Sequence, residues 1–361
     1  MEENRTKLIR ILVLAAVIVA IIATFLLILF KNRNYEFNVE QFGLDETMEL
    51  DYRNPLTGEP VAEAMGRPQV IAVMVENMVE AWPISGVEDA FLVIEAPTEA
   101  AIPRFIAFFQ EADEVNEIGP VRSARPYYLD WAKEFDALYA HVGGSPEALN
   151  LIAQNGLLDL NEFYNGWYFW RDNSRFAPHN VYTSIEQLVQ AYDDLKEKGA
   201  VDVPKYDSWK FKDDATELPE SVDRISMNFS PTYGDLYEAA WEYDALTNEY
   251  VRMQNGGSQL TRDRDEIRAN NIAVLATEIE VIDSVGRRRI ITVGEGEALI
   301  IQDGIIVEAT WAKESTAQRL RFFAKETGEE IAFNAGVTWI EVLPTLEQVG
   351  VGGEAYVESG L

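Results

Sequence analysis

The stretch Tyr139–Ile152, "YAHVGGSPEALNLI", joins an apolar strand to a helix through a glycine-rich turn. Ser145 suits the N-cap of that helix, and Pro146 suits its first position, where a missing backbone N–H costs nothing. Gly156 is expected to end the helix. Because a strand that turns directly into a helix is the unit of sheets covered by helices, the stretch predicts an α/β layer.

Neighbouring segments extend the α/β prediction over residues 68–215. Apolar spacing indicates two further helices, one that starts at Pro126 and one behind Ser184, where Gln187 completes a capping box. Short apolar runs suited to buried strands precede and separate these helices. They are "QVIAVMVEN" (69–77), "DAFLVIEA" (89–96), "PRFIAFF" (103–109) and "ALYAHV" (137–142).

The pattern changes at about residue 220. Alternating runs with evenly spaced turns predict a β-rich domain over residues 220–345, with a hairpin at Leu246–Glu249. Residues 346–361 are expected to form an acidic tail. The predicted fold class is an α/β N-terminal domain plus a β-rich C-terminal domain, α+β overall, behind a single N-terminal transmembrane helix.

That helix is predicted from Ile11–Phe30, a run of twenty uncharged residues that is long enough to cross the apolar core of a bilayer. Three basic residues precede it and two follow it, which favours a cytoplasmic tip at residues 1–10 and an extracytoplasmic remainder. Since no small-residue cleavage site follows, the run is interpreted as the uncleaved signal anchor of a single-pass cell-membrane protein. Residues 31–67 lack periodicity and are expected to form an extracellular tether.

The composition restricts the functions open to the chain. Sixty-one acidic and thirty basic residues give a net charge of −31 at pH 7, which disfavours nucleic acid as a partner. The absence of cysteine excludes disulfides, thiol catalysis and thiolate metal sites, and two histidines argue against an all-protein zinc site. No metal site and no cofactor is predicted, although the many carboxylates leave oxygen-ligand metals open.

Six motifs in combination resemble one known family: "NPLTGEP", "IGPVRSARPYYLDWA", "HVGGSPEAL", "WRDNSRFAPHNVYTS", "YDALTNEYVR" and "ATWAKES". They are similar to the YerB-like proteins, membrane-anchored or lipidated proteins of Gram-positive bacteria with two consecutive domains of unknown function. The resemblance spans nearly everything after residue 54. It implies a two-domain architecture and a location in the cell envelope, and it brings no known reaction. Many relatives carry a lipidated cysteine where this chain has an apolar segment, and the stretch Glu95–Arg104 fits the family pattern loosely.

Polar residues at the predicted strand–helix turns make up the candidate site. In an α/β sheet the carboxyl ends of strands and the N-termini of helices gather at one edge, where an anion can bind. Two histidines and four arginines there would be a local excess of positive charge that favours a phosphate or carboxylate ligand. The candidate catalytic residues are His141 and His179, and the candidate ligand-binding residues are Arg122, Ser123, Arg125, Gly143, Gly144, Ser145, Arg171, Arg175 and Asn180.

Structural roles are the alternative for these residues. The arginines can pair with carboxylates such as those of "EADEVNE" (111–117), the Gly-Gly-Ser-Pro turn can serve only to start a helix, and Asn180 can simply shape its turn. Ser145 does not fit a catalytic nucleophile, because Pro146 lacks the N–H that would complete an oxyanion hole. The strands near "ATWAKES" and "GVTWIEVLP" are interpreted as core and edge strands.

These observations favour an envelope protein that binds an anionic component in an Arg/His pocket: a cell-wall polymer, a lipid-linked phosphate or a peptide carboxylate. One alternative is an envelope enzyme acting on a phosphodiester or glycan, in which Arg122, Arg125 and Arg171 neutralise developing charge and a histidine serves as general acid or base. Another is an assembly factor that binds a protein partner through the β-rich domain. In each case the N-terminal helix makes the membrane a partner.

Overall fold

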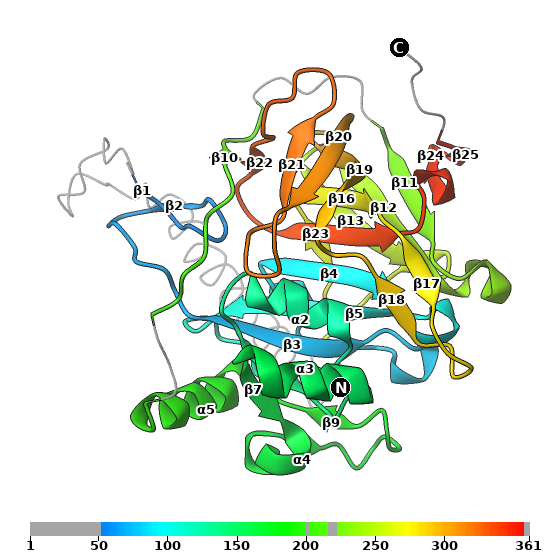
Figure 1. Ribbon diagram of the computed structural model, residues 1–361. Coiled ribbons are helices and arrows are strands. Elements are labelled where there is room, and N and C mark those ends of the chain that lie inside the picture. Colours follow the sequence, from blue (N-terminus) through cyan, green and yellow to red (C-terminus); the bar gives the residue numbers. More distant parts are fainter. Residues whose placement is uncertain (1–51, 200–202, 216–221, 357–361) are drawn as a thin grey trace, which may run out of the picture. The chain divides into compact units, whose positions relative to one another are not determined.

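Residues 52–199, 203–215 and 222–356 are described by the computed structural model (Figure 1). The main element is a ten-stranded mixed sheet in the order β21-β20-β19-β16-β23-β4-β5-β3-β6-β7. Its N-terminal strands are β3 (Val70–Glu76), β4 (Leu92–Pro97), β5 (Pro103–Gln110), β6 (Leu138–His141) and β7 (Leu158–Asn161). Its C-terminal strands are β16 (Asn271–Ala276), β19 (Gly294–Gln302), β20 (Ile305–Lys313), β21 (Arg321–Ala324) and β23 (Thr338–Leu343).

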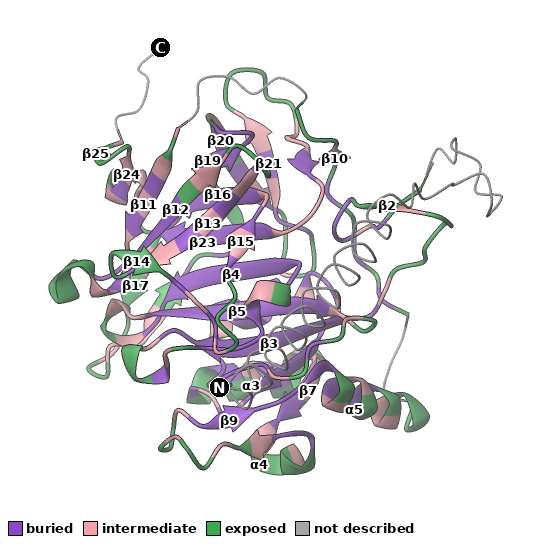
Figure 2. Ribbon diagram, turned by 180° about the vertical axis from the view of Figure 1, so that it is seen from behind, coloured by how far each residue is buried: buried purple, intermediate pink, exposed green. Residues whose placement is uncertain are grey.

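Both faces of this sheet are covered, which explains why its central strands are apolar at nearly every position. Successive residues of a strand point to opposite faces. Accordingly Ile71 and Val73 pack into one core with α5 and the second sheet, whereas Ala72 and Met74 pack into another with α2 and α3. Figure 2 shows β3, β4 and β5 as largely buried. The helices are α2 (Pro126–Lys133), α3 (Pro146–Asn155), α4 (Glu162–Asn165) and α5 (Ile185–Glu197).

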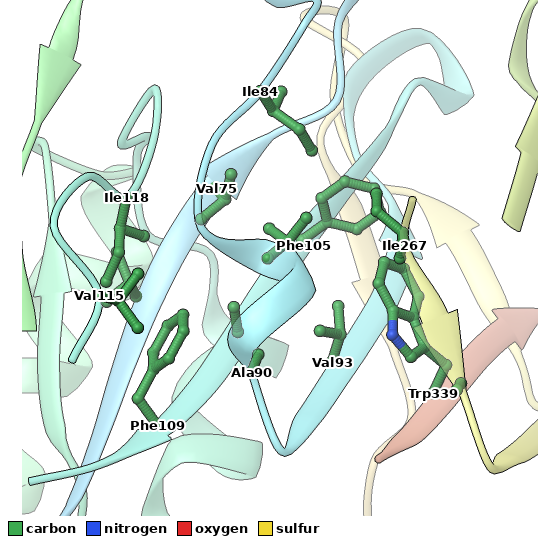
Figure 3. Close-up of a cluster of buried hydrophobic side chains, with 14 of the residues drawn as sticks. Val75, Ile84, Ala90, Val93, Phe105, Phe109, Val115, Ile118, Ile267 and Trp339 are labelled. Carbon is green, nitrogen blue, oxygen red and sulfur yellow. The ribbon is translucent and has the colours of Figure 1, made fainter. Parts of the chain in front are cut away.

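The two halves of the chain meet inside the ten-stranded sheet. β23 pairs in parallel with β4, so that Glu341 lies opposite Glu95. Trp339 of β23 packs edge-on against Phe105 of β5, with ring centroids 5.3 Å apart (Figure 3). The segments predicted as an α/β domain and a β-rich domain therefore contribute strands to one sheet, and the described residues form a single compact unit.

A second, antiparallel sheet of seven strands consists of residues from the C-terminal half. Its hairpin β12–β13 confirms the turn predicted at Leu246–Glu249. Part of the expected acidic tail instead forms the last two strands of this sheet, because β24 pairs with β11, and β25 pairs with β24 at the edge. The strands are β11 (Arg224–Asn228), β12 (Glu238–Asp244), β13 (Glu249–Gln254), β14 (Gly257–Ser258), β15 (Arg268–Ala269), β24 (Val349–Val351) and β25 (Glu354–Ala355).

Short elements complete the structure. Four two-stranded pairs are β1 (Tyr52–Arg53) with β2 (Pro60–Val61), β8 (Trp170–Arg171) with β9 (Val181–Tyr182), β10 (Phe211–Lys212) with β22 (Phe333–Asn334), and β17 (Ile279–Val281) with β18 (Arg288–Ile290). Single 3-10 turns are η2 (Val79–Ala81), η3 (Val87–Asp89), η4 (Glu99–Ala101), η5 (Gly166–Tyr168), η6 (Pro231–Tyr237) and η7 (Leu346–Gln348).

The mixed, strand-rich α/β content with few helices is as predicted, and both helix caps are confirmed. Ser145 accepts a hydrogen bond from the N–H of Ala148, and Ser184 accepts one from the N–H of Gln187. The last part of the expected tether is not an irregular segment as predicted, because β1 and β2 pair there and Leu56 is buried in the core. The predicted transmembrane helix lies outside the described residues, and no helix within them is long and apolar enough to span a bilayer.

Candidate functional site

Backbone hydrogen bonds join three motifs that lie far apart in the sequence. The segment Arg122–Arg125 runs beside the Gly-Gly turn: Val142 N–H donates to the carbonyl of Arg122 and Ala124 N–H to that of Gly143, both at 3.0 Å. The Nη1 of Arg122 donates to the carbonyl of Pro178, 3.2 Å away, which brings in the third motif. The structure thus places all three motifs near the ends of β3 and β6.

The glycine turn itself is explained by its backbone. Gly143 has φ +57°, and a side-chain carbon there would lie 2.7 Å from the ring of Phe163. Gly144 leaves room for Ala124, whose Cβ would be 3.2 Å from an added carbon. Ser145 caps α3. These three candidate residues build the turn: the two glycines leave the space that it needs, and the hydroxyl of Ser145 caps α3.

His141 is buried beneath this turn, with its side chain 0% exposed. Its Nδ1 lies 2.6 Å from the carbonyl oxygen of Gly143, and its Nε2 lies 2.6 Å from Oδ1 of Asp159. The ring also packs against Tyr139, with centroids 5.1 Å apart. Since both nitrogens are occupied by acceptors of the protein, His141 stabilises the turn and offers no atom to a substrate.

His179 and Arg122 share one carboxylate on the neighbouring strand. Nδ1 of His179 lies 2.9 Å from Oε2 of Glu76, and Nε of Arg122 lies 3.1 Å from its Oε1. Glu76 is 3% exposed, whereas the side chains of His179 and Arg122 are 18% and 19% exposed. The two histidines therefore have different partners, on β7 and β3, and only His179 reaches the surface.

The other candidate arginines are also engaged within the protein. Arg125 donates two hydrogen bonds to the carboxylate of Glu99, from Nε at 2.7 Å and from Nη2 at 2.8 Å. Arg171 donates to Glu162 at 2.8 Å and to the side chain of Asn180 at 3.1 Å. Both arginines therefore pair with carboxylates, as the structural alternative expected, but the partners are Glu99 and Glu162 and not the carboxylates of residues 111–117. For the two remaining candidates, Arg175 donates to the backbone carbonyls of Ala81 and Pro83, and the carbonyl of Ser123 accepts from Arg104.

Arg104 was not singled out from the sequence, and it is the least compensated of the buried arginines around the motifs. It is 7% exposed, and among the described residues its guanidinium has one hydrogen-bond acceptor, the carbonyl oxygen of Ser123, at 2.8 Å. In the part of the chain that the structure describes, no carboxylate lies within ion-pairing distance of it. Burial, together with the charges of Arg125 and Arg122, lowers the pKa of Arg104.

Arg104 lines a hollow of about 320 Å³, referred to below as the Arg104 hollow. Its wall includes Glu76, Asn77, Glu99, Arg122 and Tyr233. The two carboxylates are already held, Glu76 by Arg122 and His179, and Glu99 by Arg125. Two guanidinium groups and two carboxylates line the hollow, and Arg125, which pairs with Glu99 from outside the lining, adds a third positive charge to the cluster in a chain whose net charge is −31. Such a hollow can bind a phosphate or carboxylate group by charge-assisted hydrogen bonds.

One sequence signal could have revealed Arg104. It is the single charged residue in the run "PRFIAFF", whose other positions are all buried in β5. A lone arginine in such a strand must find a partner or face a polar space. Among the described residues no group of three or more histidine, aspartate or glutamate side chains is arranged to hold a metal ion.

Residues 56–198 match the family described as "Protein of unknown function (DUF3048) N-terminal domain", and residues 227–340 match its C-terminal domain. The chain is 31% identical over 311 residues to "Putative lipoprotein YerB" of Bacillus subtilis (strain 168), which covers 82% of this chain and 88% of the relative. The fold is similar to the crystal structure of the YerB protein from Bacillus subtilis, with a TM-score of 0.72, 27% identity, and coverage of 83% of this chain and 99% of that one. The chain therefore belongs to the YerB-like family, which combines the N- and C-terminal DUF3048 domains and has no known function.

Proposed function

We propose that the chain is a membrane-associated protein of the cell envelope that binds an anionic ligand in the Arg104 hollow. The location is supported by the relative named as a lipoprotein and by the apolar run Ile11–Phe30, which would hold the chain in the membrane as a single-pass anchor. Protease added to intact protoplasts should then remove the described part of the chain. Complete protection of that part would contradict the proposed orientation.

The single observation that carries the binding proposal is the state of Arg104. A buried charge is costly unless a counter-charge and hydrogen bonds accompany it. Here the protein supplies one carbonyl oxygen and two further positive charges nearby, and the two carboxylates of the hollow, Glu76 and Glu99, are paired with other cations. A bound phosphate or carboxylate would supply the missing counter-charge, and Arg122, which lines the same hollow, could contact the same group.

The geometry favours binding over catalysis. His141, one of the two general acid–base candidates, is enclosed with both nitrogens occupied. His179 contacts Glu76 through Nδ1, an arrangement that would also suit a general base, but neither histidine lines the Arg104 hollow. We therefore propose binding, and not catalysis, for this hollow.

The test is isothermal titration calorimetry of the full-length chain with glycerol 3-phosphate, which measures the affinity. Loss of one charge-assisted contact typically costs about 1.5–3 kcal/mol, or roughly ten- to a hundredfold in affinity. We expect Arg104→Gln to show a loss of this size and Arg122→Gln a comparable or smaller one.

The matched control is Arg289→Gln, which removes the same charge from an arginine that is 58% exposed on β18 and pairs with Glu280. This variant should bind as the wild type does. Wild-type affinity in Arg104→Gln, or a loss of equal size in Arg289→Gln, would contradict the proposal.

A further inference from the structure

A second hollow lies beside the Arg104 hollow. It measures about 610 Å³ and is lined by Glu80, Trp82, Arg175, Phe176, His179 and Arg262, among others. We refer to it as the Arg175 hollow. It is formed by the connection after β3 and by the loop between β8 and β9, so it contains the third sequence motif.

The two hollows are adjacent, because they share a wall. Glu76 lines the Arg104 hollow and His179 lines the Arg175 hollow, and these two side chains are hydrogen-bonded to each other at 2.9 Å. The chain from Glu76 to Pro83 also runs along both, with Glu76 and Asn77 in the first and Trp82 and Pro83 in the second. A ligand longer than one headgroup would therefore pass from one hollow into the other across the His179–Glu76 pair.

Arg175 resembles Arg104 in its hydrogen-bond partners, although it is half-buried and not buried. Its guanidinium donates to the carbonyl oxygens of Ala81 and Pro83, and no carboxylate of the described residues forms an ion pair with it. Arg262 in the same hollow differs, because Glu117 and Asp172 both pair with it. Each hollow thus holds one arginine whose hydrogen-bond acceptors are backbone carbonyls and which forms no ion pair with a carboxylate of the described residues. Glu80 is exposed at the edge of the second hollow and makes no ion pair there.

The Arg175 hollow also presents aromatic surface. Phe176 is 90% exposed, more than any other aromatic side chain that the structure describes. Trp82 is partly buried and is fixed by a hydrogen bond from its Nε1 to Asn77, at 2.9 Å. Rigid aromatic rings beside a charged group suit the C–H faces of a polyol or sugar next to a phosphate.

We infer that the anionic ligand is a polymer of phosphodiester-linked polyol or sugar units that lies across both hollows, with one phosphate at Arg104 and another at Arg175. This inference rests on the proposed function. It follows from two uncancelled guanidinium groups in adjacent hollows, which a monophosphate could satisfy only one at a time. Nucleic acid is also a phosphodiester polymer, but the net charge of −31 opposes a long polyanion that makes no further specific contacts.

The test compares three probes on the full-length chain: glycerol 3-phosphate, a short glycerol-phosphate oligomer, and an oligomer of the same phosphate number with sugar units. The wild type should bind both oligomers at least tenfold more tightly than the monomer, since two contacts act together. Arg175→Gln should lose about tenfold for the oligomers and nothing for the monomer. Arg104→Gln should weaken all three probes.

A further variant distinguishes sugar from polyol units in the ligand, and it changes a residue that the fold does not need. Phe176→Ala removes an exposed ring and should leave the melting temperature unchanged, so a fold defect cannot explain its effect. A loss of a few-fold for the sugar oligomer alone indicates sugar units, and a loss for the glycerol-phosphate oligomer alone indicates polyol units, whereas no change with either would overturn the role of the aromatic surface.

Equal oligomer binding by Arg175→Gln, Arg289→Gln and the wild type would overturn the inference while leaving the Arg104 site intact. Retained binding of every probe by Arg104→Gln would overturn the proposed function itself. Tighter binding of single-stranded oligothymidylate than of either oligomer would replace the inferred ligand with nucleic acid.

Discussion

Two clusters of buried arginine lie on opposite faces of the ten-stranded sheet, and they differ in how their charge is balanced. Arg252, which is 0% exposed, contacts Glu95 at 2.5 Å, Glu341 at 3.0 Å and Gln259 at 2.6 Å. Every nitrogen of its guanidinium has a side-chain acceptor. Arg104, on the other face, has one backbone carbonyl and a hollow beside it.

The comparison separates a charge that is balanced within the fold from one that, in our proposal, is balanced by a ligand. Arg252 connects the second sheet with the place where the two halves of the chain meet, since Glu95 and Glu341 are cross-strand neighbours. Burial raises the pKa of Glu95 well above its usual range, against the lowering effect of Arg252 and with the help of the charge of Glu341. Arg252 contacts both carboxyl groups. The cluster around Arg104 has no such balance.

The largest effect is expected from Arg252→Met. The change leaves two buried carboxyl groups without their cation, which typically costs about 3–5 kcal/mol. Urea unfolding should show this loss in the free energy of unfolding. The control is Arg268→Met, because Arg268 is 33% exposed and its three carboxylate partners can turn to water, so its change should cost less than about 1 kcal/mol. Similar losses in both variants would remove the distinction between the buried cluster and a surface one.

A smaller effect is expected from Arg125→Met, on the same face as Arg104. Arg125 is 12% exposed, and its two hydrogen bonds to Glu99 are structural in this account. Its loss should cost roughly 1.5–3 kcal/mol in unfolding free energy. Although burial opposes it, the contact with Arg125 lowers the pKa of Glu99, so this stabilisation should be present above the usual glutamate pKa and disappear as the pH falls. A pH-independent difference between Arg125→Met and the wild type from pH 3 to pH 7 would contradict this explanation.

The smallest effect concerns Glu88, a partly buried carboxylate that forms no ion pair with a described residue. Burial, with the nearby Asp89 and Asp265, raises the pKa of Glu88 to about 7, against hydrogen bonds that lower it. A raised carboxyl pKa means that the folded state holds the proton more tightly, so stability falls as the pH rises from 4.5 to about 7. Glu88→Gln should therefore match the wild type at pH 4.5 and exceed it at pH 8 by on the order of 1–2 kcal/mol. A variant that is less stable at pH 8 would show that Glu88 has a cationic partner.

Local features of the fold could be predicted from the sequence, because their signals lie within a few residues. The cap at Ser145, the capping box at Ser184 and the hairpin at Leu246–Glu249 are of this kind. The shared sheet could not be predicted, because the parallel pairing of β23 with β4 joins Glu341 to Glu95. Nothing in either strand specifies a partner so distant in the sequence.

The sequence predicted which turns form the candidate site, but it did not predict how the charged side chains there pair with one another. Glycine, proline and cap residues marked the turns where the motifs meet, and these turns are adjacent. Which arginine would lack a counter-charge depends on side chains from separate strands and loops, such as Glu76 beside Arg122 and Glu99 beside Arg125. Arg104 and Arg252 both lie in strands. Only their three-dimensional surroundings show that every guanidinium nitrogen of Arg252 has a side-chain acceptor, whereas Arg104 has one backbone acceptor.

The central claim is that Arg104 destabilises the unliganded protein and is compensated by its ligand. The most direct test is the unfolding free energy of Arg104→Met with and without glycerol 3-phosphate, measured beside Arg125→Met. Without ligand, Arg104→Met should be at least as stable as the wild type, because it removes an unpaired buried charge. With ligand, the wild type should gain stability and Arg104→Met should not. A loss in Arg104→Met as large as that in Arg125→Met, with an unchanged response to ligand, would show that Arg104 is a structural arginine.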